Sequence, residues 1–103
     1  MYATIRRYER VDHERSEELS KKVNERLMPR LSKLPGFGGY YLIEAANGAM
    51  TSIGFFDTAS QADESTRIAA DWVREEKLES ALPVPPVVMS GEIVAKDLNG
   101  VRA

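Results

Sequence analysis

Cysteine is absent from this chain of 103 residues, and histidine occurs only once, at position 13. Without thiols the chain can form no disulfide, zinc finger or iron–sulfur cluster. A single histidine also removes histidine-rich metal sites and a conventional Ser-His-Asp triad within one chain. His13 follows a helix-capping aspartate, so we expect it on the surface. We therefore expect neither a bound metal nor a cofactor.

Long apolar runs and a strong excess of one charge are also missing. No segment approaches the roughly 20 apolar residues of a membrane-spanning helix, and Met1-Tyr2-Ala3 does not begin a signal peptide. The 14 Lys and Arg side chains are balanced by 16 Asp and Glu, for a net charge of −2. Strongly basic nucleic-acid binders and polybasic membrane anchors have a different charge balance. We expect a cytoplasmic protein without nucleic-acid or membrane partners.

The composition is that of an ordinary globular protein, with 43% hydrophobic and 29% charged residues. A chain of this length fits one domain. We predict a single domain over residues 1–97 and a polar C-terminal tail over residues 98–103.

The first third of the chain predicts a strand followed by a helix. Residues 2–8 are aromatic and β-branched, which is typical of a strand. Asp12 is a suitable N-cap for a helix that ends at Leu34-Pro35-Gly36. Pro29 lies inside this helix and predicts a kink or short break. The apolar stripe of the helix consists of Leu19, Val23, Leu27, Leu31 and Leu34.

The middle of the chain predicts a β-hairpin made of residues 37–45 and 49–57. Asn47-Gly48 is the pair most typical of a two-residue type I′ turn. The register that follows pairs Ala46 with Ala49, Leu42 with Ile53, and Tyr40 with Phe55.

A second helix and a last strand complete the pattern. Thr58 and Gln61 form a capping box, and the helix is expected to end near Lys77 or Leu78. Its inward positions are Ala62, Ser65, Ala69, Trp72 and Val73. The proline-rich residues 82–86 predict a stiff extended connection, and residues 87–96 predict the last strand.

The order strand-helix-strand-strand-helix-strand predicts an α+β, ferredoxin-like fold with a four-stranded antiparallel sheet. Two helices can cover only one face of such a sheet, so the other face should be polar in a monomer. Instead, both faces of the hairpin and of the last strand carry large apolar side chains. Exposing them costs about 25 cal/mol per Å², so we expect a second copy to cover the open face in a homodimer.

Several short motifs resemble the antibiotic-biosynthesis-monooxygenase type of dimeric α/β barrel. They are Tyr2-Ala3-Thr4-Ile5-Arg6-Arg7-Tyr8, Leu34-Pro35-Gly36-Phe37 running into Tyr40-Tyr41, Ala70-Asp71-Trp72-Val73 and Gly91-Glu92-Ile93-Val94. The resemblance implies a homodimer whose two sheets close into a barrel, with a small pocket between sheet and helices in each subunit.

The resembled superfamily includes cofactor-free monooxygenases that oxidise polycyclic phenols, and enzymes that degrade haem. Trp72 matches a pocket tryptophan of the quinone-forming members, whereas Ile68 stands where they have asparagine. No histidine follows His13, which argues against haem degradation. Two functions stay open: binding of an aromatic or apolar small molecule with cofactor-independent monooxygenase activity, and a non-catalytic binding or interaction module of the same fold.

The candidate ligand-contacting residues are Trp72, Arg7, Arg6, Tyr41, Tyr40, Ser65 and Glu92. Arg6 and Arg7 point to opposite sides of the first strand, so one of them must face a packed side. A buried guanidinium needs either an acidic partner, for which Glu92 is the candidate, or an anionic ligand. Tyr40 and Tyr41 also face opposite ways, and Ser65 lies on an otherwise apolar helix face. No catalytic residue is assigned.

Overall fold

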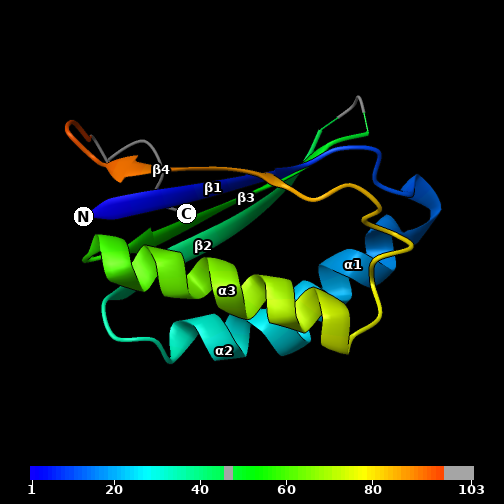
Figure 1. Cartoon of the computed structure of the whole chain (residues 1–103), viewed down its shortest axis with the longest axis horizontal. Helices are drawn as coiled ribbons and strands as arrows, with labels where there is room; N and C mark the ends of the chain where they lie inside the picture. Colours follow the sequence, from blue (N-terminus) through cyan, green and yellow to red (C-terminus); the bar gives the residue numbers. More distant parts are fainter. Residues whose placement is uncertain (46–47, 97–103) are drawn as a thin grey trace.

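The computed structural model describes residues 1–45 and 48–96, and it has the predicted ferredoxin-like fold. All neighbouring strands are antiparallel, in the order β2-β3-β1-β4. The helices lie together on one side of the sheet, and no described element covers the other side (Figure 1). The predicted tail, residues 98–103, lies outside the described residues. The strands are β1 (Tyr2–Tyr8), β2 (Phe37–Glu44), β3 (Met50–Phe56) and β4 (Val87–Glu92).

The predicted break in the first helix is a π-helical turn directly before Pro29. The helical region consists of η1 (His13–Arg15), α1 (Ser16–Lys22), the π turn η2 (Val23–Leu27) and α2 (Met28–Ser32). The backbone N–H of Met28 donates to the carbonyl of Val23, five residues earlier. Because proline has no N–H and crowds the preceding turn, a regular α-helix is disfavoured here. The side chains of Val23 and Leu27 are both buried by this turn.

The second helix, α3 (Ala59–Glu75), begins at the predicted capping box. The backbone N–H of Gln61 donates to Thr58 Oγ1 at 3.3 Å, and the N–H of Thr58 donates to Gln61 Oε1 at 3.1 Å. These two bonds satisfy donors that a helix start otherwise leaves free. The helix buries Ala62, Ser65, Ala69 and Trp72 against the sheet, as its periodicity predicted.

The predicted register of the hairpin is wrong by one residue. Tyr41 lies opposite Ile53 and Leu42 opposite Ser52, so Leu42 does not pair with Ile53. The N–H of Ala45 donates to the carbonyl of Ala49 at 2.9 Å, which leaves three residues in the loop. Gly48 has a φ of 87°, a conformation that closes a three-residue loop without a side-chain clash. The Asn-Gly signal located the hairpin correctly, but it did not fix the loop length.

The last strand is shorter than predicted, because β4 ends at Glu92 rather than at residue 96. Glu92 pairs with Tyr2, the first residue of β1. Only one further backbone bond follows, from the N–H of Ile93 to the carbonyl of Met1 at 2.8 Å. A strand needs a neighbour, and β1 provides none beyond this point.

Both faces of the sheet are apolar, as expected. On the covered face, Met50 and Phe56 are 3% and 0% exposed. On the open face, Tyr41 and Met89 remain 55% and 63% exposed. The corrected register places Ile53 and Phe55 on this open face with Tyr41, instead of with Tyr40 and Leu42. The further exposed apolar side chains of the open face are Ile43 and Val87.

None of the helices in residues 1–45 and 48–96 combines the length and the apolar character that crossing a bilayer demands.

Candidate functional site

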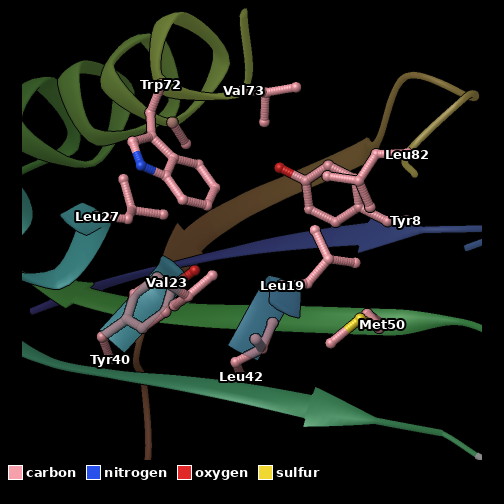
Figure 2. A pocket seen from close by; sticks show the side chains of 11 residues that line it. Tyr8, Leu19, Val23, Leu27, Tyr40, Leu42, Met50, Trp72, Val73 and Leu82 are labelled. Atoms are coloured by element: carbon pink, nitrogen blue, oxygen red, sulfur yellow. The ribbon is translucent and has the colours of Figure 1, made fainter. Parts of the chain in front are cut away.

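Two adjoining hollows lie between the sheet and the helices. The outer pocket has a volume of about 280 Å³ and lies between β1, α3 and the connection that follows α3. The inner cavity measures about 30 Å³ and lies under Trp72. Figure 2 shows Trp72 and Val73 reaching down from α3 toward side chains of the sheet. The outer pocket is lined by Arg6, Tyr8, Thr66, Ala70, Val73, Arg74, Glu79, Leu82, Pro83, Val84, Pro85 and Pro86.

Arg6 is the charged residue on which the outer pocket depends. Alternation along β1 points it at α3, where it is 1% exposed. Its Nη1 donates to Thr66 Oγ1 at 3.3 Å, and within the described residues its Nε has no hydrogen-bond partner. No carboxylate of these residues forms an ion pair with Arg6. The guanidinium is therefore buried without an acidic partner in this part of the chain, and its Nε is an unused donor.

The predicted ion pair between Arg6 and Glu92 is wrong. Arg6 lies opposite Val88 on β4, whereas Glu92 lies opposite Tyr2. Four residues of strand separate the two positions, or about 13 Å of backbone. β1 and β4 are neighbouring strands, as the prediction required. Their register nevertheless places Arg6 and Glu92 near opposite ends of the paired region.

Ser52 adds a second unsatisfied polar group beside Arg6. It pairs with Arg6 across β1 and β3 and is 1% exposed, and within the described residues its Oγ has no hydrogen-bond partner. Buried polar groups are nearly always hydrogen-bonded in native proteins. Arg6 Nε and Ser52 Oγ are therefore two unsatisfied polar groups at neighbouring positions, of which only Arg6 lines a hollow.

Tyr8, two residues after Arg6, lies at the boundary of the two hollows and lines both. Burial raises the pKa of its phenol, and the neighbouring guanidinium of Arg6 partly opposes that rise. Because a raised pKa keeps the phenol protonated at neutral pH, Tyr8 can donate a hydrogen bond there but cannot act as a base. Its hydroxyl points toward the Trp72 side of the inner cavity (Figure 2).

Trp72 is 2% exposed and forms a wall of the inner cavity. Figure 2 shows the indole nitrogen on the side of Leu27, with the six-membered ring turned toward the centre of the cavity. The indole Nε1 has no hydrogen-bond partner. A cavity of about 30 Å³ can hold water but not an aromatic ring, since a dry cavity that binds benzene measures about 150 Å³.

The structure brings three of the seven predicted site residues to the two hollows, namely Trp72, Arg6 and Tyr40. Arg7 and Tyr41 lie on the opposite, open face of the sheet. Arg7 Nε pairs with Glu9 at 3.3 Å, and the ring of Tyr41 packs edge-on against Phe55. Tyr41 also lines a third hollow of about 300 Å³ between β2 and the first helical region, together with Tyr40 and Asn24. A ligand contact for Arg7 and Tyr41 stays an untested prediction.

Ser65 and Glu92 also lie away from both hollows. Ser65 is fully buried, and its Oγ donates to the carbonyl of Ala62 at 2.6 Å, inside the same helix. Its hydroxyl is therefore already used by the backbone of α3. Glu92 is exposed at the end of β4. Their roles in ligand binding stay untested predictions.

Sequence reasoning missed Tyr8, Thr66 and the connection formed by residues 82–86. Tyr8 could have been found, because it lies two residues after Arg6 and therefore on the same strand face. Thr66, Ala70 and Val73 are spaced four and three residues apart, so they share one face of α3. No local signal placed residues 82–86 over Arg6, since this depends on how the connection crosses the sheet.

The fold has close counterparts among solved structures. A protein from Bordetella bronchiseptica that is named an antibiotic biosynthesis monooxygenase superposes with a TM-score of 0.72 and 21% identity. The match covers 91% of this chain and 97% of that one. The ActVA-Orf6 monooxygenase of Streptomyces coelicolor, solved with the ligand nanaomycin D, gives 0.64 and 17%, covering 92% of each chain. A dimeric ferredoxin-like protein from an uncultured marine organism gives 0.68 and 15%, covering 93% and 90%.

This chain has the fold of the antibiotic-biosynthesis-monooxygenase-like proteins. The expectation drawn from the short motifs is therefore confirmed at the level of the fold. No family model and no curated protein matches the sequence.

The raised pKa of Tyr8 predicts a specific loss of stability at high pH. The folded protein keeps this phenol neutral, whereas the unfolded chain ionises it near pH 10. The contribution of the neutral phenol to the free energy of unfolding is therefore present below that pH and is lost above it. We expect the free energy of unfolding to fall less between pH 8.5 and pH 10.5 in Tyr8→Phe than in the native sequence. Urea titrations at the two pH values measure this difference.

The matched control for that measurement is Tyr41→Phe, which removes an exposed phenol from the opposite sheet face. Equal pH dependence in Tyr8→Phe and the native sequence would contradict the assignment of Tyr8 as a buried neutral phenol.

Proposed function

We propose that this chain is a small dimeric protein that binds an aromatic anion in the outer pocket, with the anionic oxygen at Arg6. The observation that carries this proposal is a guanidinium that is 1% exposed, has no acidic partner among the described residues and borders a mostly apolar pocket. Burying an unpaired charge costs several kcal/mol, and a bound anion offsets that cost.

The ligand chemistry follows from the groups around the pocket. A guanidinium presents a planar set of N–H donors that matches a carboxylate, and it also stabilises a phenolate or enolate oxygen. The walls contributed by Ala70, Val73, Leu82 and Val84 suit flat apolar rings. The volume of about 280 Å³ lies near the lower end of small-molecule sites, which suits one or two rings.

The reaction we propose is a cofactor-independent oxygenation; two of the structural neighbours are named monooxygenases. An anthrone, the keto form of a hydroxyanthracene, loses a proton from its methylene carbon to give an enolate. That carbon is oxidised by O₂ with formation of a C–O bond, and the peroxide anion takes up the proton. The resulting hydroperoxide loses water to leave a quinone. Both atoms of O₂ are accounted for, one in the quinone and one in water. Arg6 would stabilise the enolate oxygen, and the neutral Tyr8 hydroxyl would donate a further hydrogen bond.

The non-catalytic alternative also has an observation in its favour. Trp72 matches the pocket tryptophan of quinone-forming enzymes, but the cavity under it measures only about 30 Å³. Its ring is therefore packed mainly against other side chains and has little room for a ligand. No histidine is present to act as a base near the outer pocket, and Tyr8 is held neutral. Deprotonation would have to rely on Glu79, the one carboxylate among the described residues that line the outer pocket, or on the acidity of the substrate itself.

We propose that a second copy of this chain covers the open sheet face. Ile43, Val87 and Met89 are 47%, 58% and 63% exposed in a single chain, on a surface that also carries Ile53 and Phe55. Contiguous apolar patches of this kind mark association surfaces. The open sheet closes into a barrel only if such a copy packs against it, and one structural neighbour of the same fold is dimeric.

Arg6→Met should weaken the binding of 1-hydroxy-2-naphthoate by about 10- to 100-fold, because a hydrogen bond to a charged group is worth about 1.5–3 kcal/mol. Isothermal titration calorimetry measures this change. Arg7→Met is the matched control, since Arg7 is the neighbouring exposed arginine on the other face. Equal affinity in Arg6→Met and the native sequence would remove the proposed binding site.

Oxygen uptake separates the enzyme from the non-catalytic binding module. With a hydroxylated anthrone we expect protein-dependent consumption of one O₂ per molecule oxidised, and a lower rate in Arg6→Met at saturating substrate. An oxygen electrode and the absorbance of the quinone product measure both quantities. A rate equal to that of buffer, together with intact binding, would favour the non-catalytic module.

Met89→Glu should convert the dimer into monomers, because it places a charge on the open apolar face, where Met89 of the edge strand β4 is 63% exposed. Multi-angle light scattering on a size-exclusion column at micromolar concentration measures the mass. Lys21→Glu, on the outer face of α1, is the control and should leave the dimer intact. A native chain that is folded and monomeric at this concentration would rule out the proposed dimer.

A further inference from the structure

Three residues line both the outer pocket and the inner cavity, and they form the partition between the two. They are Tyr8, Val73 and Leu82, which come from β1, α3 and the connection after α3. Figure 2 shows the side chains of Leu82 and Tyr8 close together, on the opposite side of the cavity from Trp72. The two hollows are therefore separated by side chains, with no strand or helix between them.

The three side chains of this partition differ in how firmly their backbones are held. Tyr8 belongs to β1, the strand that pairs with both β3 and β4. Val73 lies within α3, a helix of 17 residues. Leu82 has one backbone bond, from its N–H to the carbonyl of Leu78 at 2.9 Å.

Beyond Leu82 the connection is held only at its far end. No backbone hydrogen bond joins residues 83–86 to the rest of the described chain, and pairing resumes at Val87. Three of these four residues are prolines, which have no N–H to donate. Leu82 is therefore the member of the partition whose backbone can move at the smallest cost in hydrogen bonds.

We propose that the side chain of Leu82 distinguishes ligands by length. It closes the inner cavity when a short ligand binds in the outer pocket, and a long ligand displaces it. This inference rests on the proposed binding of an aromatic anion at Arg6. A one-ring anion fills the outer pocket and leaves Leu82 in place. An anion with three fused rings extends past the partition, displaces Leu82 and packs its far ring against Trp72.

The volumes of the two hollows support this role. The outer pocket alone, at about 280 Å³, is small for three fused rings, and the inner cavity, at about 30 Å³, cannot accept one ring by itself. Joined through the position of Leu82, they give one elongated site. Its outer end carries a buried positive charge, and its inner end carries the indole ring and the phenols of Tyr8 and Tyr40.

A first experiment tests the partition without any ligand. Trp72 is the chain's single tryptophan, so its fluorescence reports on the inner cavity alone. We expect Leu82→Ala to increase the quenching of this fluorescence by acrylamide at least twofold. Val84→Ala is the matched control, because Val84 lies on the same connection but lines only the outer pocket. Equal quenching in both variants, with native circular dichroism, would show that Leu82 does not close the inner cavity.

A second experiment tests ligand size. Binding of benzoate and of anthracene-2-carboxylate, whose three rings lie in line beyond the carboxylate, is measured by calorimetry in the native chain, Leu82→Ala and Val84→Ala. We expect Leu82→Ala to raise the ratio of anthracene-2-carboxylate to benzoate affinity about tenfold, and Val84→Ala to leave it unchanged. An unchanged ratio in Leu82→Ala overturns the role of Leu82.

The two proposals fail in different ways in this experiment. If benzoate binds and depends on Arg6 while the affinity ratio stays constant, the binding site stands and the role of Leu82 is wrong. If neither anion binds to the native chain, the proposed function and the inference that rests on it both fail.

Discussion

A positive charge enclosed between the sheet and α3 constrains much of this structure. Arg6 points inward because β1 alternates, and α3 covers it because the capping box at Thr58 starts the helix where it crosses that face. Charged side chains are rarely buried without an ionic partner, because removing them from water is costly. Here the partial compensation comes from the hydroxyl of Thr66 and from the neighbouring phenol of Tyr8. The cost of burying this charge without an acidic partner among the described residues is the main support for the proposed anionic ligand.

The sheet is a second constraint, and it acts at a larger scale. Both of its faces are apolar, but the helices cover only one (Figure 1). The covered face contains the buried polar groups Arg6, Ser52 and Thr4, whereas the open face contains mainly apolar side chains. Of these buried polar groups, Arg6 lines the outer pocket, while the apolar surface lies where a second copy is proposed. The two faces of one sheet thus carry the proposed binding site and the proposed association surface.

The elements of the fold were largely predictable from local patterns. The strand at residues 2–8, the capping box at Thr58 and the irregularity near Pro29 depend on neighbouring residues, and each was located correctly. The hairpin register was wrong, because three residues separate Ala45 from Ala49 and Gly48 closes the loop with a positive φ. The end of β4 was also wrong, because it depends on where its partner β1 begins.

The sequence by itself determined the fold class and named Trp72 and Tyr40 as candidates for the site. It also showed that one of the adjacent arginines Arg6 and Arg7 must face a packed side, without deciding which. Only the tertiary structure decided that Arg6 lies opposite Val88 instead of Glu92, that Arg7 faces the other side, and that residues 82–86 cross over the pocket. The physical reason is that periodicity fixes which face a side chain is on. Which side chains meet depends on strand register and on the course of the connections, and both are set by contacts between segments distant in sequence.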